Sequence, residues 1–398
     1  MTGACGVQMH GPLAQFADGF AEALVAEGYS KERARLLMGL MAEVSHWLGG
    51  GGLRAGDLTG EVIDEFFAGR GPRRSVCRTA RSLQPIMAHL RSIGVAAAPT
   101  RVSGRTDAEA ELLDCYRRWC ITQRGLTSTT ADQYVARVVL LRPDARFAVA
   151  DLDGRAILTT VRAAADLMPS PSLRCMVTAL RSFLRFLHAT GRAPASLVAA
   201  VPALKTWPRT TLPSVLSAGD ARRLVAGCDP ATARGRRDAA IVLVLLRLGL
   251  RASEVARLAL DDIDWRHGEM MIKGKGGRCD QLPLPVEVGE AIAVYLHGGR
   301  PSSSSRSAFL TATAPIRPLS SDGVTTLVYR TCARAGVARV GPHALRRTLA
   351  TETLRAGAPM SEVAQLLRHV DQATSSIYAA ADVAAVAALA QPWPEVRG

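Results

Sequence analysis

The sequence predicts a mainly α-helical protein with a small antiparallel β-element in its C-terminal half. Most segments place apolar residues at helical spacing, and two N-terminal segments repeat one order of helices. One short stretch, around GKGGR, instead has the composition of two strands joined by a turn. At 398 residues the chain is long enough for two or three domains, each with its own core.

Residues 13–94 contain the first helical group. Ser30 has the place of an N-cap before an amphipathic helix, and the glycine run 49–52 should end that helix. Two further helices follow, and Pro85 in the second of them predicts a kink or a break. A small helical domain is therefore expected at the N-terminus.

Residues 109–191 follow the same plan. The segment DLDGRAILTTV is similar to the earlier DLTGEVIDEFF, and the helix that follows each of them is rich in arginine. The similarity lies in the order of the helices and not in identity, which indicates an internal duplication of a four-helix unit. The last helix of the second copy presents arginines that either meet phosphates or form an ordinary solvated face, and these are Arg174, Arg181 and Arg185.

The proline-punctuated segment 192–213 should stay extended, because each proline biases the preceding residue away from helix. A new domain then begins at the SAGD sequence, residues 217–220, which predicts a capping box. The expected domain boundaries are 1–98, a linker at 99–108, 109–195, a linker at 196–213, and 214–398 with a tail helix.

The third domain should open with helices at about 217–227 and 236–249. The sequence LGLRASEVARLAL then places Arg251 in the turn between two helices, with Ser253 as the cap of the second. A β-hairpin follows with Lys275 at its tip. Such a lysine is either only exposed to solvent or able to reach into a groove as a proton donor. Further helices are expected at 286–297 and 322–335.

The stretch from His343 to Tyr378 gathers polar groups suited to a phosphate. His343 and Arg346 are three residues apart, so a helix would place both on one face. A Gly-Ala-Pro break should end that helix, Ser361 should cap the next, and His369 should close it. Taken singly, an HxxR motif is more often structural, and a lone tyrosine is more often part of a core.

The charge balance favours a polyanionic partner. The formal net charge is +14, from 49 Lys and Arg against 35 Asp and Glu, and the basic residues are dispersed along the chain. The eight cysteines form no CxxC pair, which suits a reducing cytoplasm and no structural metal. The sequence contains no run of about 18 apolar residues, so it predicts no membrane span. A merely basic protein without a polyanion partner remains the alternative on charge alone.

Taken together, four motifs resemble those of the tyrosine recombinase (phage integrase) family. They are LGLRASEVARL, IKGKGGRCDQLPLP, HALRRTLAT and LLRHVDQATSSIY, and they occur in the family's order. Lys275 follows Arg251 by 24 residues and Tyr378 follows His369 by nine, which are compatible spacings. The resemblance is strong over 213–380. It implies two helical DNA-clamping domains followed by a mixed α/β catalytic domain that is mostly helical.

The resemblance implies roles for six residues. Tyr378 would attack the scissile phosphodiester and form a 3′-phosphotyrosyl bond. Arg251 and Arg346 would hold the non-bridging oxygens, for which a guanidinium is suited because it offers paired donors and stays charged. Lys275 would protonate the 5′-oxygen, His343 would serve in proton transfer at the tyrosine, and His369 would donate a hydrogen bond to the phosphate. Arg278 and Arg347 are further candidates for contact with DNA.

The same resemblance implies double-stranded DNA as the partner, a homo- or hetero-tetramer on DNA and possible sister recombinases. It implies no metal, no other cofactor and no ATP, since the covalent bond conserves the energy for rejoining. The expected role is integration or transposition of a mobile element. Type IB topoisomerase-like relaxation and a non-catalytic architectural role on DNA are the alternatives.

Two segments depart from the family's usual plan or extend it. The extra N-terminal helical unit could contact accessory DNA, extend the clamp or pair with another protomer. The small, apolar tail after Tyr378 (381–398) could dock into a neighbouring subunit or pack on its own domain.

Overall fold

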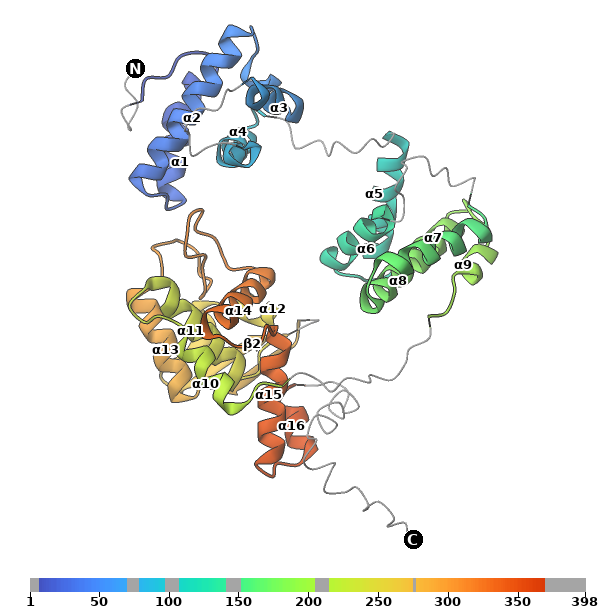
Figure 1. Ribbon diagram of the computed structural model, residues 1–398, viewed down its shortest axis with the longest axis vertical. Helices are drawn as coiled ribbons and strands as arrows, with labels where there is room; N and C mark the ends of the chain where they lie inside the picture. The colour runs from blue at the N-terminus through green and yellow to red at the C-terminus, as the bar shows by residue number, and fades with distance from the viewer. Residues whose placement is uncertain are drawn as a thin grey trace, which may run out of the picture. The chain divides into compact units, whose positions relative to one another are not determined.

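The computed structural model describes residues 7–69, 79–96, 107–140, 152–204, 215–274 and 277–368 (Figure 1). The chain divides into two compact units, of which one contains 1–98 and 211–398 and the other 99–210. The described residues are mostly helical and include one three-stranded sheet, which confirms the predicted fold class. The helices that the structure describes include none long and apolar enough to cross a membrane.

The second N-terminal helix begins and ends where the sequence predicts, after Ser30 and in the glycine run. The hydroxyl of Ser30 accepts a hydrogen bond from the backbone N–H of Arg33 at 3.2 Å, and this cap starts the second helix. Pro85 lies in the first turn of the fourth helix, so it marks a break and not a kink. The four α-helices are α1 (Ala17–Ala26), α2 (Lys31–Gly50), α3 (Gly60–Ala68) and α4 (Gln84–Ser92).

The unit formed by 99–210 has its own aromatic core. Tyr116 is fully buried, its ring lies 5.1 Å from that of Phe183, and its hydroxyl donates to the carbonyl of Ala179 at 3.3 Å. The helices are α5 (Asp107–Thr122), α6 (Ser128–Leu140), α7 (Gly154–Leu167), α8 (Ser170–Ala189) and α9 (Ser196–Ala200).

Helix α9 lies in the segment 192–213, which the prolines led us to expect as extended, so that prediction was wrong for these residues. Leu197 and Val201 are buried, and α9 packs against α7 and α8. Burial of the apolar residues between the prolines therefore outweighs the local bias of each proline.

Residues 215–368 fold around α11, most of whose residues are buried. This helix contacts α10, α12, α13, α14 and α15. Of the capping box predicted at 217–220, the serine cap is present: the Ser217 hydroxyl accepts the backbone N–H of Asp220 at 3.0 Å and donates to the Asp220 carboxylate at 2.8 Å. The helices are α10 (Ala218–Ala226), α11 (Ala233–Arg247), α12 (Ala252–Arg257), α13 (Val286–Gly298), α14 (Ser321–Ala335), α15 (Pro342–Arg355) and α16 (Met360–Leu366).

The predicted hairpin is present as strands β2 (Glu269–Lys273) and β3 (Cys279–Pro283), which pair antiparallel from Glu269 opposite Pro283 to Lys273 opposite Cys279. A third strand, β1 (Ile263–Asp264), adds to β2 in the order β1-β2-β3. It was not predicted, because two residues are too short to show a periodicity.

Two predicted serine caps were wrong. Helix α12 starts at Ala252, one residue before Ser253, and the Glu254 carboxylate accepts the backbone N–H of Arg251 at 2.8 Å at its N-terminus. Helix α16 starts at Met360 after Pro359, and no side chain caps it, so Ser361 is already inside the helix. A nearby carboxylate and a proline set these two helix starts in place of the serines.

Candidate active site

The backbone before Arg251 is held by close packing. Gly249 has a φ of +58°, and a Cβ there would lie 2.9 Å from a methyl carbon of Leu349 and 3.1 Å from one of Leu367. Only glycine combines this left-handed conformation with such contacts. The turn therefore presents Arg251 from a fixed frame, with 37% of its side chain exposed.

Arg251 and His343 line one pocket of about 360 Å³. Arg251 comes from the turn between α11 and α12, and His343 from the first turn of α15. These two residues are 92 positions apart in the chain and were both predicted to face one phosphate. Tyr329, from α14, lines the same pocket, and the guanidinium carbon of Arg339 lies 4.1 Å from its ring centroid.

His343 is surrounded by positive charge. Although the residue as a whole is exposed, partial desolvation of its imidazole lowers the pKa, and the charges of Arg346, Arg347 and Arg251 lower that pKa further. All these effects favour the neutral ring. Close to neutral pH, His343 is therefore in the form that can accept a proton.

Arg346 is buried and joins two turns. Its Nη1 donates to the carbonyl of Gly249 and its Nη2 to the carbonyl of Leu367. The residue is 3% exposed, whereas its neighbour Arg347 is half-buried. Of the two adjacent arginines, Arg346 thus fixes the backbone just before Arg251.

Glu254 orients Arg251 through two hydrogen bonds. Its carboxylate accepts the Arg251 backbone N–H at 2.8 Å and one Nη1–H of the same residue at 2.7 Å. Arg368 donates at 2.7 Å to Oε2, the oxygen that also accepts the Arg251 backbone N–H. Burial opposes ionisation of Glu254, but the Arg251 backbone hydrogen bond and the charges of Arg368 and Arg251 outweigh it and lower the pKa of this carboxyl.

Two other basic residues of the hairpin are paired with carboxylates. Lys273 donates to Asp262 at 2.8 Å, and Arg278 lies 3.3 Å from Asp280 with more than half of its side chain exposed. Lys275 itself lies outside the described residues, as do the predicted His369 and Tyr378. Their assignment stays a prediction, and so does the docking of the tail.

The arginines predicted to meet phosphates on α8 differ in their surroundings. Arg181 donates to the backbone carbonyls of Val201 at 3.3 Å and Pro202 at 2.9 Å, so it fixes the segment after α9. Arg174 and Arg185 are exposed.

Two residues at the site were missed by sequence reasoning. Tyr329 offers no motif, since a single half-buried tyrosine in a helix is ordinary. Arg368 precedes the predicted His369 in LLRHVDQ, and only its burial and its backbone conformation single it out.

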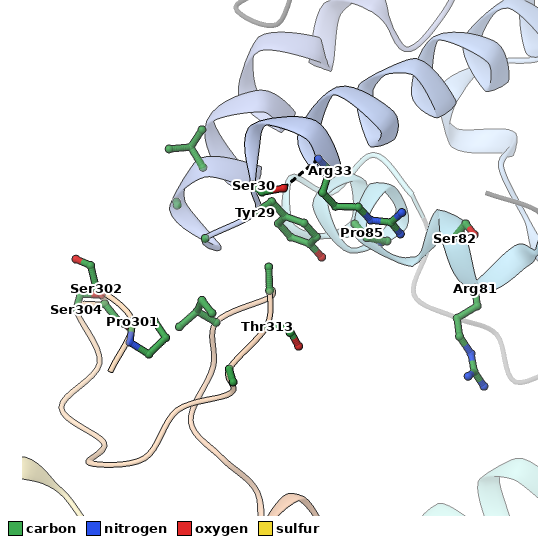
Figure 2. A pocket seen from close by; sticks show the side chains of 17 residues that line it. Tyr29, Ser30, Arg33, Arg81, Ser82, Pro85, Pro301, Ser302, Ser304 and Thr313 are labelled. Carbon is green, nitrogen blue, oxygen red and sulfur yellow. Dashed lines mark hydrogen bonds between the residues drawn. The ribbon is translucent and has the colours of Figure 1, made fainter. Parts of the chain in front are cut away.

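A second pocket, of about 1000 Å³, lies in the same unit (Figure 2). Tyr29, Ser30 and Arg33 line it from the turn into α2, and Pro301 and Thr313 line it from the loop after α13. None of the described residues predicted for catalysis borders this pocket, so we place the chemistry at the smaller one. Among the residues that the structure describes, no group of three or more His, Cys, Asp or Glu could hold a metal ion.

Comparison with known proteins agrees with this fold. The model of the phage integrase family matches residues 214–384. The "Putative integrase/recombinase y4rA" of Sinorhizobium fredii (strain NBRC 101917 / NGR234) is 36% identical over 391 residues, which are 96% of this chain and 95% of that protein. The tyrosine recombinase XerD of Listeria innocua serovar 6a is 26% identical over 285 residues, 67% of this chain and 93% of that one.

Solved structures share the fold. A lambda integrase (75–356) dimer bound to a COC′ core site matches with a TM-score of 0.54 and 19% identity, over 72% of this chain and 98% of that one. The XerH site-specific recombinase in a post-cleavage complex with palindromic difH matches with a TM-score of 0.54 and 15% identity, over 72% and 89% of the two chains. The chain belongs to the phage integrase family, whose members are tyrosine-type site-specific DNA recombinases.

Proposed function

We propose that this protein cuts and rejoins double-stranded DNA at specific sites through a 3′-phosphotyrosyl intermediate, in the integration or transposition of a mobile element. The observation that carries the proposal is the meeting of Arg251 and His343 in one pocket of a chain from the recombinase family. The neighbouring Arg346 and Arg347 add to the positive potential, which suits a phosphodiester.

The reaction balances without an external reactant. The phenolic oxygen of Tyr378 attacks phosphorus, the bond from phosphorus to the 5′-oxygen breaks, and the 3′-phosphate becomes attached to the tyrosine. The phenolic proton passes to neutral His343, and Lys275 gives a proton to the departing 5′-oxygen. Attack by a 5′-hydroxyl reverses each step and rejoins the strand.

Arg251 and Arg346 have distinct parts in this scheme. Arg251 is partly exposed at the pocket and would bind a non-bridging oxygen, whose negative charge grows in the transition state. Arg346 would contact the phosphate while it donates to the carbonyls of Gly249 and Leu367. It would thereby hold the turn before Arg251 and the end of α16 in place around the phosphate. His369 would donate to the remaining oxygen.

Assembly is also part of the proposal. Among the structural neighbours, lambda integrase is bound to DNA as a dimer and to a Holliday junction as a tetramer. We expect this chain to bind double-stranded DNA and to form a tetramer on it, with itself or with sister recombinases.

The decisive test is trapping of a covalent adduct. The full-length protein is incubated with randomly nicked fragments of the DNA that flanks its own gene, and a denaturing gel shows whether labelled DNA stays attached. Wild type should form an adduct, with or without EDTA, and Tyr378→Phe should form none. Tyr134→Phe, a half-buried tyrosine of α6, is the matched control and should trap DNA as wild type does.

Contrary outcomes are specific. An adduct that persists in Tyr378→Phe but is lost in Tyr329→Phe would move the nucleophile to the tyrosine that lines the pocket. No adduct from wild type on any fragment would favour the architectural role. Relaxation of a supercoiled plasmid without exchange between sites would favour the topoisomerase alternative.

A further inference from the structure

Arg368 has a backbone conformation that its side chain disfavours. It follows Leu367 at the end of α16, and its φ of +54° is positive, unlike that of any other non-glycine residue that the structure describes. Glycine is the residue that helix ends ordinarily use in this conformation, because a Cβ strains it. A residue held in a strained conformation directs attention to what its side chain does.

The guanidinium of Arg368 is buried but incompletely bonded. Its side chain is 5% exposed, and Nη2 donates to Glu254 at 2.7 Å. Nε lies 3.9 Å from Asp280, beyond hydrogen-bonding distance, and both Nε and Nη1 lack a hydrogen-bond partner within the described part of the chain. Buried polar groups without partners are rare in proteins, so this arrangement is costly on two counts.

The bond that Arg368 does make leads to the candidate active site. Glu254 is 2% exposed and accepts from Arg251 through both the backbone N–H and Nη1. One carboxylate is thereby fixed between two guanidiniums, of which one is buried and one faces the pocket. Removal of Arg368 would leave Glu254 with hydrogen bonds from Arg251 alone.

We propose that Arg368 is a positioning residue, which orients Glu254 so that Glu254 in turn holds Arg251 in its place at the phosphate. This inference rests on the proposed function, since Arg251 acts there as the phosphate ligand. Its cost in backbone strain is explained if glycine, although better suited to the turn, would leave the Glu254 carboxylate held by Arg251 alone.

The test uses the full-length protein and the nicked fragments of flanking DNA. In Arg368→Gly we expect unchanged affinity for the fragments, measured at a temperature at which the variant is folded. The rate of adduct formation at saturating DNA should fall at least tenfold. Arg368→Lys can still reach one oxygen of Glu254, so it should recover most of the rate.

A double-mutant cycle separates positioning from other roles. If Arg368 acts through Glu254, then Arg368→Gly should slow Glu254→Gln by less than twofold. A tenfold fall in that background, or a lysine variant as slow as the glycine variant, would overturn the proposal. So would weaker DNA affinity with a wild-type rate at saturation, which would make Arg368 a DNA contact.

Two controls complete the design. If the glycine variant does not fold, Arg368→Met replaces it in the same cycle, because it keeps apolar volume and removes the charge. If Tyr378→Phe still forms adduct, the proposed function fails; if Tyr378→Phe forms none while Arg368→Gly matches wild type, only the present inference fails.

Discussion

Two clusters in the C-terminal part have the same composition and different degrees of bonding. In each, a buried carboxylate lies between one buried and one partly exposed arginine. Asp238 lies between Arg237, 5% exposed, and Arg334, 41% exposed. Glu254 lies between Arg368, 5% exposed, and Arg251, 37% exposed.

The Asp238 cluster is bonded on every guanidinium nitrogen of its buried arginine. Arg237 donates from Nε and Nη2 to Asp238 at 3.2 and 2.8 Å, and from Nη1 to the carbonyl of Leu310 at 3.1 Å. Arg334 donates to Asp238 at 2.9 Å and to Thr331 at 3.0 Å. Arg368, in contrast, has two nitrogens without a described partner.

The difference favours a structural role for the Asp238 cluster and, within the proposed function, a role in the reaction for the Glu254 cluster. A fully bonded ion cluster is costly to break, but nothing in it is directed at a ligand. An incompletely bonded cluster whose exposed member lines a pocket is typical of a functional site. Composition alone therefore does not distinguish the two; the hydrogen bonds do.

The largest effect that separates the clusters is expected from Arg251→Ala. Loss of a donor to the developing phosphate charge should slow adduct formation about 10²–10³-fold. The free energy of unfolding should fall by less than in Asp238→Ala, because Glu254 keeps the bond from Arg368 and that from the backbone N–H of residue 251. Single-turnover trapping and urea unfolding measure the two quantities. Arg247→Ala, which removes a surface pair with Glu287, is the matched control and should leave both nearly unchanged. Equal rates for the two alanine variants would remove Arg251 from the site.

Asp238→Ala should show the opposite pattern. Two guanidiniums lose their shared partner, one of them buried, so the free energy of unfolding should fall by about 3–5 kcal/mol. The rate of adduct formation per folded molecule should stay that of wild type. Urea unfolding and trapping at low temperature measure these. A variant that is as stable as wild type but slow would show that the Asp238 cluster also affects the reaction. The proposed difference between the Asp238 and Glu254 clusters would then be wrong.

The smallest effect concerns pH. Desolvation and three arginines lower the pKa of His343 below its usual 6.5. In the proposed reaction the ring could therefore accept the proton of Tyr378 at pH 7, and it would lose this ability only as the pH falls through that lowered value. The unfolded chain binds this proton up to higher pH than the folded protein does. The free energy of unfolding therefore rises with pH between the lowered folded pKa and the unfolded pKa of about 6.5, and above that pH this group causes no further change. The rate should decline by a few-fold as the pH falls through this lowered pKa, below the usual value of about 6.5.

Arg347→Gln sharpens this expectation. Removal of one nearby charge should move the decline in rate to higher pH, since the pKa of His343 then lies closer to its usual value. His343→Gln should be slow and lack the decline. A pH–rate profile from pH 5 to 8 checks both; an unchanged decline in His343→Gln would assign it to another group.

Local signals predicted most of the helices but not how their ends are set. The cap at Ser30 and the break at Pro85 follow from the residues themselves. Ser253 and Ser361 were predicted as caps by the same rule and were wrong, since the start of each helix depends on a competing carboxylate or proline. Helix α9 depends on burial against α7 and α8, which no local pattern encodes.

The site was predicted in part, and mainly through the resemblance to a family. Spacing indicates that His343 and Arg346 share a helix face, but nothing local places Arg251 beside them across 92 positions. Arg368 could not be found, because its interest lies in a positive φ and in missing hydrogen bonds. Lys275, His369 and Tyr378 stay predictions.

The two carbonyl contacts of Arg346 have a thermodynamic consequence. One guanidinium joins the residue before Leu250 to the residue before Arg368, so the start of α12 and the end of α16 share a partner. In the proposed function, an event that moves Leu367 away from Arg346 would weaken anion binding at Arg251. By reciprocity, an anion bound there would favour the contact between Arg346 and Leu367 to the same extent.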